Sequence, residues 1–368
     1  MKECYCGLDL HSNNTFIGIS DEDGRRVFQR RSPNDISGIL EYLKPFKESI
    51  SGVVVESTFN WYWLVDGLIE AGYKVHLAHP PAIVQYMGLK NQDDKHSAFH
   101  LAKLLNLGIL PEGYIFPKEE RHLRDFLRKR LMMVQNSTKY ILNFKSLMNR
   151  NFSVSISSNE IKKLKPDQLK EAFFKDYHLL LSARSSISAI NYFHDEIKSI
   201  EKEILKEATL KDEFQILLTA PGIGKILALT IALETGNINR FSKVGNYASY
   251  CRSVSSIRSS NSKKKGTGNK KNGNKYLSWA YLEGAHKLRR YCLEAKAFYE
   301  KKKIKTNNVV AIKALAHKLS RACYYMMKDN IAFDVEKIFG KPIKVGGGSK
   351  STGGLAKKPN APIDNTAA

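Results

Sequence analysis

Several features are scarce or missing in this sequence of 368 residues. No run of about 18 apolar residues occurs, which excludes a transmembrane helix. The first residues, Met1-Lys2-Glu3-Cys4, lack the apolar stretch of a signal peptide. The five cysteines are scattered and odd in number, and Cys4-x-Cys6 has no second pair of ligands at zinc spacing. We therefore expect a cytoplasmic protein with reduced thiols and no membrane partner.

Acidic residues are also fewer than basic residues. Asp and Glu total 36 against 59 Lys and Arg, so the formal net charge is +23. A folded protein with this excess favours a polyanionic partner such as nucleic acid, and a ribosome-like or merely soluble basic protein is the alternative. A hydrophobic share of 42% excludes a wholly disordered chain, and the length allows two domains.

The first part of the chain has the pattern of an α/β domain. Apolar residues predict strands at 4–20 and 25–31 that form a three-stranded meander, with a turn at Asp23-Gly24. The elements expected next are a helix near 35–48, a strand at 53–55, a helix from 61 closed by Gly72, a strand at 74–78 and helical segments from 81 to 107. This order is typical of a ribonuclease-H-like fold, although other α/β domains share it.

The rest of the chain is predominantly helical in pattern. From about 117 to 205, apolar residues are spaced for one face of long helices, which indicates a helical arm or, equally, a plain helical bundle. A compact domain is expected from about Phe214 to Phe339, and the Gly-rich, polar sequence beyond it predicts a flexible tail. The expected division is 1–115 (metal-binding α/β domain), 116–210 (arm), 211–340 (C-terminal domain) and 341–368 (disordered tail).

Two carboxylates end or interrupt apolar strands. Asp9 lies within an apolar strand, and Glu56 closes the run 53–55. A buried lone carboxylate is costly unless it is paired or bound to metal. Adjacent strand ends of one sheet would bring the two together, and a divalent cation would keep both ionised. Each residue taken singly fits an ordinary surface acid equally well.

A third acidic position opens a predicted helix. In Asp93-Asp94, a carboxylate could reach the same pocket, as in nucleases that hold two cations about 4 Å apart. His96 and His100 are four residues apart on this helix, but no Glu stands between them and no third ligand is near. Solvated or packing histidines therefore fit better than a zinc pair.

Two segments of the C-terminal domain favour contact with phosphates. The turn that contains Gly222, Gly224 and Lys225 enters an apolar helix, as in a helix-hairpin-helix DNA clamp, and a tight turn between packed helices is the alternative. The stretch 258–275 carries no acid. Its candidate nucleic-acid-binding residues are Arg258, Lys263, Lys264, Lys265, Lys270, Lys271 and Lys275. One interpretation is a basic loop in which a serine hydroxyl is activated to attack a phosphodiester. A merely solvated loop is the alternative, since the sequence identifies no general base.

Together these segments resemble the bridge-RNA-guided transposases of the insertion-sequence one-ten family, and most closely its eleven-eleven branch. The similarity extends to about residue 335. The segments that carry it are Gly7–Ser12, Val55–Gly67, Leu107–Ile115, Pro221–Gly224 and Gly273–Leu277.

The resemblance implies a RuvC-like domain with an Asp, Glu, Asp, Asp metal set for Mg²⁺ or Mn²⁺, a coiled-coil-like arm and a C-terminal serine that joins covalently to DNA. Its implied partners are double-stranded DNA at element ends and target, a structured guide RNA, and further copies of the chain in a tetramer built from dimers. It also implies a bacterial, nucleoid-associated protein. By position, Asp9, Glu56 and Asp94 match the first three acids, and Ser259 matches the nucleophile, with Ser260 as the alternate.

The chain departs from the family pattern at two positions. Ser97 stands where the fourth acid is expected, and a neutral serine is a weak metal ligand. Asp93 lies one helical turn before Ser97 and would compensate in part. Ser255 replaces a proline ahead of the nucleophile, which makes the geometry near Ser259 less certain.

Three functions are compatible with these residues. The leading hypothesis is a transposase that exchanges DNA strands through a metal site and a serine. The second is a catalytically impaired relative that binds nucleic acid, which Ser97 favours. The third is a RuvC-like junction nuclease that acts by hydrolysis alone, which would leave the C-terminal domain unexplained.

Overall fold

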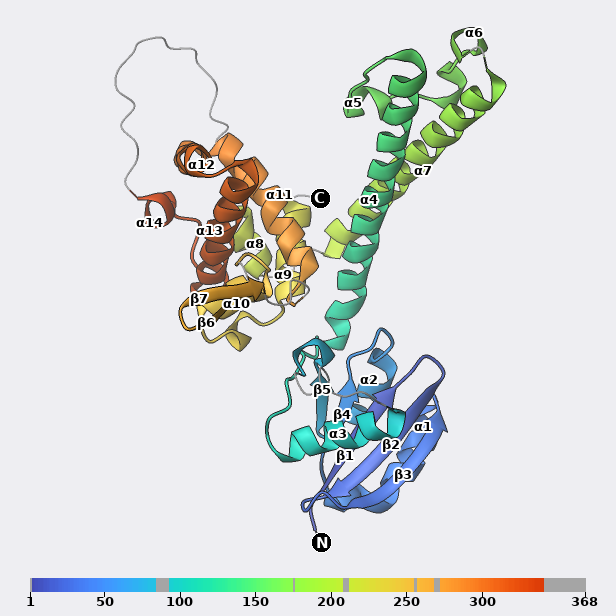
Figure 1. Cartoon of the computed structure of the whole chain (residues 1–368), viewed down its shortest axis with the longest axis vertical. Coiled ribbons are helices and arrows are strands. Elements are labelled where there is room, and N and C mark those ends of the chain that lie inside the picture. Colours follow the sequence, from blue (N-terminus) through green and yellow to red (C-terminus); the bar gives the residue numbers. More distant parts are fainter. Residues whose placement is uncertain are drawn as a thin grey trace, which may run out of the picture.

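The N-terminal part of the chain folds around a five-stranded sheet (Figure 1). The computed structural model describes residues 2–83, 93–174, 176–207, 212–254, 257–267 and 272–340. The strands of the sheet are β1 (Cys4–Leu10), β2 (Asn14–Asp21), β3 (Arg26–Pro33), β4 (Ile50–Glu56) and β5 (Val75–Ala78). Their order is β3-β2-β1-β4-β5.

Strand directions divide this sheet into two halves. β1, β2 and β3 are antiparallel, so the predicted meander is confirmed, and Gly24 supplies the turn between β2 and β3 with φ +80°. β4 runs parallel to β1, and β5 runs parallel to β4. β1 is therefore the central strand. Because parallel neighbours end at the same sheet edge, the last residues of β1 and β4 come together there.

Helices cover the sheet and complete the domain. They are α1 (Ile36–Leu43), the 3-10 helix η1 (Lys44–Ser49), α2 (Tyr62–Glu70), the 3-10 helix η2 (Pro80–Ala82) and α3 (Asp94–Asn106). The single helix predicted over 35–48 is thus two elements, because Pro45 starts a tighter turn. Of the helical segments predicted from 81 to 107, residues 84–92 lie outside the described residues.

One glycine lets α3 approach the sheet. A Cβ on Gly7, in the middle of β1, would lie 1.9 Å from the Ala98 carbonyl oxygen in α3. Only a residue without a side chain permits this contact. The first turn of α3 is thereby held beside the end of β1.

A pair of long helices forms the arm that rises from the α/β domain in Figure 1. The elements of the arm are α4 (Lys118–Phe152), α5 (Ser158–Ile161), the 3-10 helix η4 (Pro166–Gln168), α6 (Glu171–Phe174) and α7 (Tyr177–Glu207). Phe144 of α4 shares a buried cluster with Ile187 of α7, and Arg130 pairs with Glu201 at 2.6 Å. The two long helices therefore run antiparallel, with the short elements at the tip.

The C-terminal part is mainly helical, with one small hairpin. Its elements are α8 (Asp212–Leu218), α9 (Lys225–Thr235), the 3-10 helix η6 (Ile238–Arg240), α10 (Val244–Tyr250), β6 (Ile257–Ser260), β7 (Lys263–Thr267), α11 (Lys275–Tyr291), α12 (Leu293–Lys305), α13 (Asn308–Asp329) and α14 (Val335–Phe339). Its hydrophobic core also contains Leu127 of α4 and Ile204 of α7, so the base of the arm is packed into this core.

Two further expectations concern the cysteines and membrane-spanning helices. All five cysteines are buried and unbonded, in agreement with reduced thiols. No helix among the described residues has both the length and the apolar character needed to cross a bilayer. The predicted tail, 341–368, lies outside the described residues.

Candidate active site

Asp9 and Glu56 meet where two parallel strands end. The register pairs Leu8 of β1 with Val55 of β4, so Asp9 and Glu56 are the next residues on neighbouring strands. Their carboxyl groups share a hydrogen bond. The sequence-based expectation that adjacent strand ends bring these two acids together agrees with this geometry.

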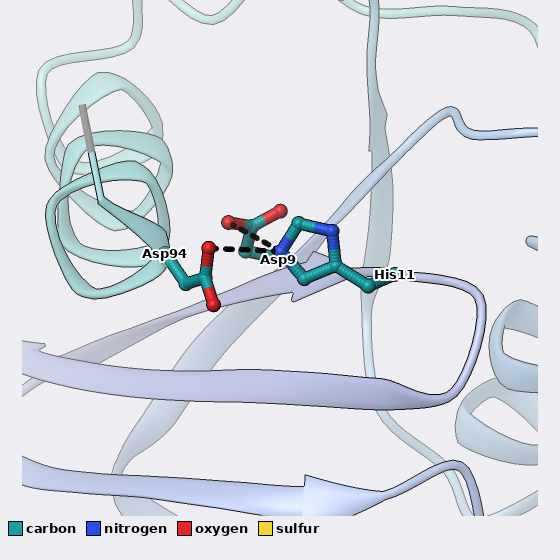
Figure 2. A group of neighbouring side chains, drawn as sticks. All are labelled: Asp9, His11 and Asp94. Carbon is teal, nitrogen blue, oxygen red and sulfur yellow. Dashed lines mark ion pairs between the residues drawn. The ribbon is translucent and has the colours of Figure 1, made fainter.

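Asp94, in the first turn of α3, lies close to Asp9 and His11 (Figure 2). Nε2 of His11 lies 3.0 Å from Asp94 Oδ1 and 3.5 Å from Asp9 Oδ2. The other oxygen of Asp94 accepts a hydrogen bond of 2.7 Å from Nη2 of Arg31. One ligand atom from each of Asp9, His11 and Asp94 lies within 4.8 Å of the other two.

Burial makes this site unfavourable for several bare carboxylates. Asp9 is 4% exposed, and burial raises its pKa. Burial also raises the pKa of Glu56 to about 7, and the charge of the neighbouring Asp9 adds to the effect. Two carboxyl groups this close ionise together only with difficulty, so the pair favours keeping a proton. A divalent cation in place of that proton would allow both to ionise.

The residues present fit a hard divalent cation. Mg²⁺ and Mn²⁺ prefer carboxylate oxygens, which Asp9, Glu56 and Asp94 offer from three different elements. His11 was not among the predicted ligands, although it stands two residues after Asp9 at the end of β1. Arg31 was also missed, because only the pairing of β3 with β2 brings it to the site.

The remaining candidate residues at the start of α3 make contacts outside the carboxylate group. Asp93 caps the helix, and its Oδ1 accepts a hydrogen bond of 2.6 Å from the backbone N–H of His96. That bond engages one oxygen of the carboxylate that was predicted to compensate for the missing fourth acid. Ser97 stands one turn after Asp94 on the same helix face. The rings of His96 and His100 stack 6.0 Å apart, which fits packing histidines better than a zinc pair.

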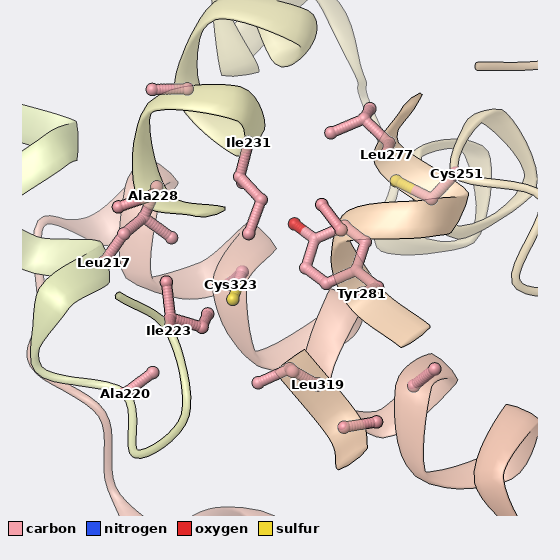
Figure 3. Packing of buried hydrophobic residues seen from close by; sticks show 14 of the residues in the cluster. Leu217, Ala220, Ile223, Ala228, Ile231, Cys251, Leu277, Tyr281, Leu319 and Cys323 are labelled. Atoms are coloured by element: carbon pink, nitrogen blue, oxygen red, sulfur yellow. The ribbon is translucent and has the colours of Figure 1, made fainter. Parts of the chain in front are cut away.

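The predicted phosphate-binding turn has two different sides. Ala220 and Ile223 point into the hydrophobic core (Figure 3). A Cβ on Gly222, where φ is +92°, would lie 2.6 Å from the backbone nitrogen of Leu288 in α11, so Gly222 serves the packing of two helices. Gly224, the N-cap of α9, and Lys225 are exposed. Only this second side is open to a phosphate.

The basic segment is a hairpin where the sequence predicted a loop. β6 and β7 pair in antiparallel fashion, with Ser259 opposite Lys264 and Ser260 opposite Lys263. Asn261 and Ser262 have φ values of 49° and 57°, which is the backbone of a tight two-residue turn. The loop prediction was wrong because Asn and Ser at these positions tolerate positive φ without a glycine. Ser255, Lys270 and Lys271 lie outside the described residues.

A buried ion cluster anchors the chain after this hairpin. Asn274 caps α11 and donates a hydrogen bond of 2.7 Å to Glu234 of α9. Glu234 is 2% exposed and also pairs with Arg124 and Arg128 of α4, at 3.1 and 2.5 Å. Burial alone would raise the pKa of Glu234, but these arginines hold it below its usual value. Sequence analysis did not identify Glu234, because it lies in an apolar helix far from its partners.

Comparison with known families identifies two regions of the chain. Residues 6–153 match the DEDD transposase model of the IS110 type. Residues 214–300 match a model described as the transposase IS116/IS110/IS902 family. No curated protein sequence matches the chain. The first match contains every carboxylate of the site described above, and the second contains Glu234 and the hairpin.

Proposed function

The chain carries both IS110-family transposase domains and is a transposase, and from this premise we propose that it cuts and rejoins insertion-sequence ends and target DNA with a RuvC-like metal site and the hydroxyl of Ser259. The meeting of Asp9, Glu56 and Asp94 at one sheet edge is the observation that carries the proposal. The strand order, an antiparallel meander followed by parallel strands, supports a ribonuclease-H-like fold for this domain.

The three acids have separate roles in this proposal. Asp9 and Glu56 supply fixed negative charge from neighbouring strands, and Asp94 closes the site from α3. A bound Mg²⁺ or Mn²⁺ would stabilise charge on the attacking and leaving oxygens of the phosphodiester. His11 lies between Asp9 and Asp94, so it orients their carboxylates.

The serine provides the covalent step. The hydroxyl oxygen of Ser259 attacks phosphorus and loses its proton, one P–O ester bond of the DNA breaks, and the released sugar oxygen takes up a proton. The phosphoserine ester keeps the strand end activated for rejoining, so no external energy source is required. Ser260 is the alternate nucleophile. The cations of the hairpin, Lys263 and Lys265 among them, favour phosphate binding there.

The proposed guide RNA and oligomeric state follow from the sequence resemblance. We propose that a structured RNA selects the DNA sites, as in the eleven-eleven branch, and that the working form is a tetramer built from dimers. The net charge of +23 supports a nucleic-acid partner. The paired helices α4 and α7 supply a long surface for contact between copies.

A second candidate function is nucleic-acid binding without efficient catalysis. Ser97 provides no charge at the fourth position, and Asp93 is engaged as a helix cap. Arg31 and His11 already occupy both oxygens of Asp94, so a metal cation competes with two side chains of the protein. These contacts favour weak metal binding.

A denaturing gel separates the two candidates. The full-length protein is incubated with Mg²⁺, labelled element-end and target DNA, and the RNA transcribed beside the gene. A slow-migrating adduct that disappears in Ser259→Ala and persists in Ser260→Ala supports the serine transposase. An adduct that forms only with Ser97→Asp identifies an impaired copy. No adduct with any variant leaves binding alone as the function.

A further inference from the structure

A cleft of about 700 Å³ lies between the α/β domain and the C-terminal domain. One wall is formed by the residues that follow Glu56, from Ser57 to Tyr62, and by the segment from Glu112 to Phe116. The other wall is formed by Arg240, Tyr250 and Arg252, and by the start of α11. Because Ser57, the residue after Glu56, lines the cleft, this wall begins one residue from the carboxylate site.

Aromatic rings dominate the wall next to the carboxylates. Phe59 is 87% exposed, an unusual state for a phenylalanine in a folded domain. Across the cleft, Tyr276 lies at the start of α11. Trp61 and Tyr62 already have the Arg121 guanidinium over their rings, at 4.7 and 4.9 Å. Phe59 is therefore the ring whose faces are most open to a planar ligand.

The opposite wall carries positive charge. Glu234 pairs with both Arg124 and Arg128, and one carboxylate offsets only one of these two charges. Arg240, Arg252 and the exposed Lys275 also line the cleft. The carboxylates that line it are Glu112, which pairs with His76, and Asp125. The cleft thus combines open aromatic surface with an excess of cations, which favours a ligand with flat rings and negative charge.

Arg240 is held in a fixed orientation on the cationic wall. Its guanidinium lies 4.4 Å from the ring centre of Tyr114 and 4.5 Å from that of Tyr250, so the rings fix its plane. Its Nε donates to the carbonyl of Thr235 at 3.0 Å, whereas the buried Nη2 has no acceptor among the described residues. The positive charge of Arg240 is thereby held at the wall of the cleft.

We propose that this cleft binds an unpaired nucleotide of the DNA strand whose phosphodiester lies at the carboxylates, with the base stacked on Phe59 and a phosphate held by the cationic wall. The proposal rests on the function proposed above for the choice of DNA. Stacking on aromatic rings accepts every base, so the cleft holds the strand without selecting its sequence. It would keep the strand apart from its complement beside the site of cleavage.

The test measures binding of single-stranded DNA to the full-length protein in EDTA, so that neither metal nor cleavage contributes. Fluorescein-labelled oligodeoxythymidine gives Kd by anisotropy, and an oligonucleotide with one 2-aminopurine reports stacking by quenching. We expect Phe59→Ala to raise Kd about tenfold and to abolish the quenching. Tyr291→Ala, at another aromatic residue that is 72% exposed, is the matched control and should change neither quantity.

Three results would overturn the proposal. Unchanged Kd and quenching in Phe59→Ala would remove the stacking role, and equal losses in Phe59→Ala and Tyr291→Ala would show general binding to the surface. Tighter, Phe59-dependent binding of oligouridine than of the DNA would assign the cleft to RNA. Asp9→Asn separates this proposal from the previous one, since it should keep the binding of single strands even if no covalent adduct forms in any variant.

Discussion

The carboxylate site and the serine-bearing hairpin are built in different ways. Asp9 and Glu56 lie near the ends of the central strand β1 and its neighbour β4 in a five-stranded sheet. Helix α3, which carries Asp94, packs closely against this sheet at Gly7. The hairpin is a two-stranded sheet, held after its end by Asn274 and the Glu234 cluster. A two-stranded hairpin has little stability of its own. We infer that one domain preorganises the charge, whereas the position of the nucleophile depends on partners outside the hairpin.

The largest expected effect on activity concerns the carboxylate site, whose charges are held in place by the sheet. Asp9→Asn keeps the shape of the side chain but removes the central charge, so formation of the covalent adduct with Mg²⁺ should fall by roughly a thousandfold or more. The rate is measured from the denaturing gel. Asp23→Asn, at an exposed acid of the β2–β3 turn, is the control. A rate within tenfold of the wild type would show that Asp9 does not carry the reaction.

The next effect tests the anchor of the hairpin. Glu234→Gln leaves Arg124 and Arg128 without their buried counter-charge, and breaking such a pair costs about 3–5 kcal/mol. Urea unfolding measures the loss. Glu203→Gln, which removes an exposed ion pair with Lys206, should destabilise the protein far less, because solvent screens that pair. Similar losses in the two variants would mean that the buried cluster does not anchor the domain.

A smaller effect concerns the contact that positions Asp94. Gly7→Ala places a Cβ against the Ala98 carbonyl and must displace α3, which should destabilise the protein by about 1–3 kcal/mol and weaken binding of Mg²⁺. Gly245→Ala, in α10 with open space around it, is the control and should be neutral or stabilising. Thermal unfolding with and without Mg²⁺ gives both quantities. Unchanged metal binding in Gly7→Ala would separate Asp94 from the metal site.

The smallest expected effect is the dependence of metal affinity on pH through the ionisation of Glu56. Its folded-state pKa of about 7 lies above the ordinary value of 4.5, so without metal this group destabilises the fold progressively as pH rises from about 4.5 to 7. A cation binds the ionised form, so its affinity should rise by up to about tenfold per pH unit below pH 7 and level off above it. The shift in Tm caused by Mg²⁺, measured from pH 5.5 to 8, should show this rise. Glu56→Gln should flatten it, and an unchanged profile in that variant would exclude Glu56 as the titrating group.

Much of the α/β domain could be predicted because its signals are local. The alternation of apolar residues gave the strands, and their parallel ends gave the meeting of Asp9 and Glu56. Pro45 and the turn at Asn261-Ser262 led to errors, since a 3-10 helix and a positive-φ turn without glycine leave weak traces in composition. Asp93 has a role as helix cap that the sequence left open, because a carboxylate before a helix fits a metal ligand and an N-cap equally well.

The sequence by itself determined the order of the elements in the α/β domain, the reduced cysteines and the three acids of the candidate site, because each depends on residues close together in the chain or on the strand that carries them. Tertiary structure alone decided the contacts of Arg31 with Asp94 and of Glu234 with Arg124 and Arg128, and it formed the cleft beside Phe59. These features join residues from separate elements. Their energies depend on distance and burial, which spacing along the chain does not encode.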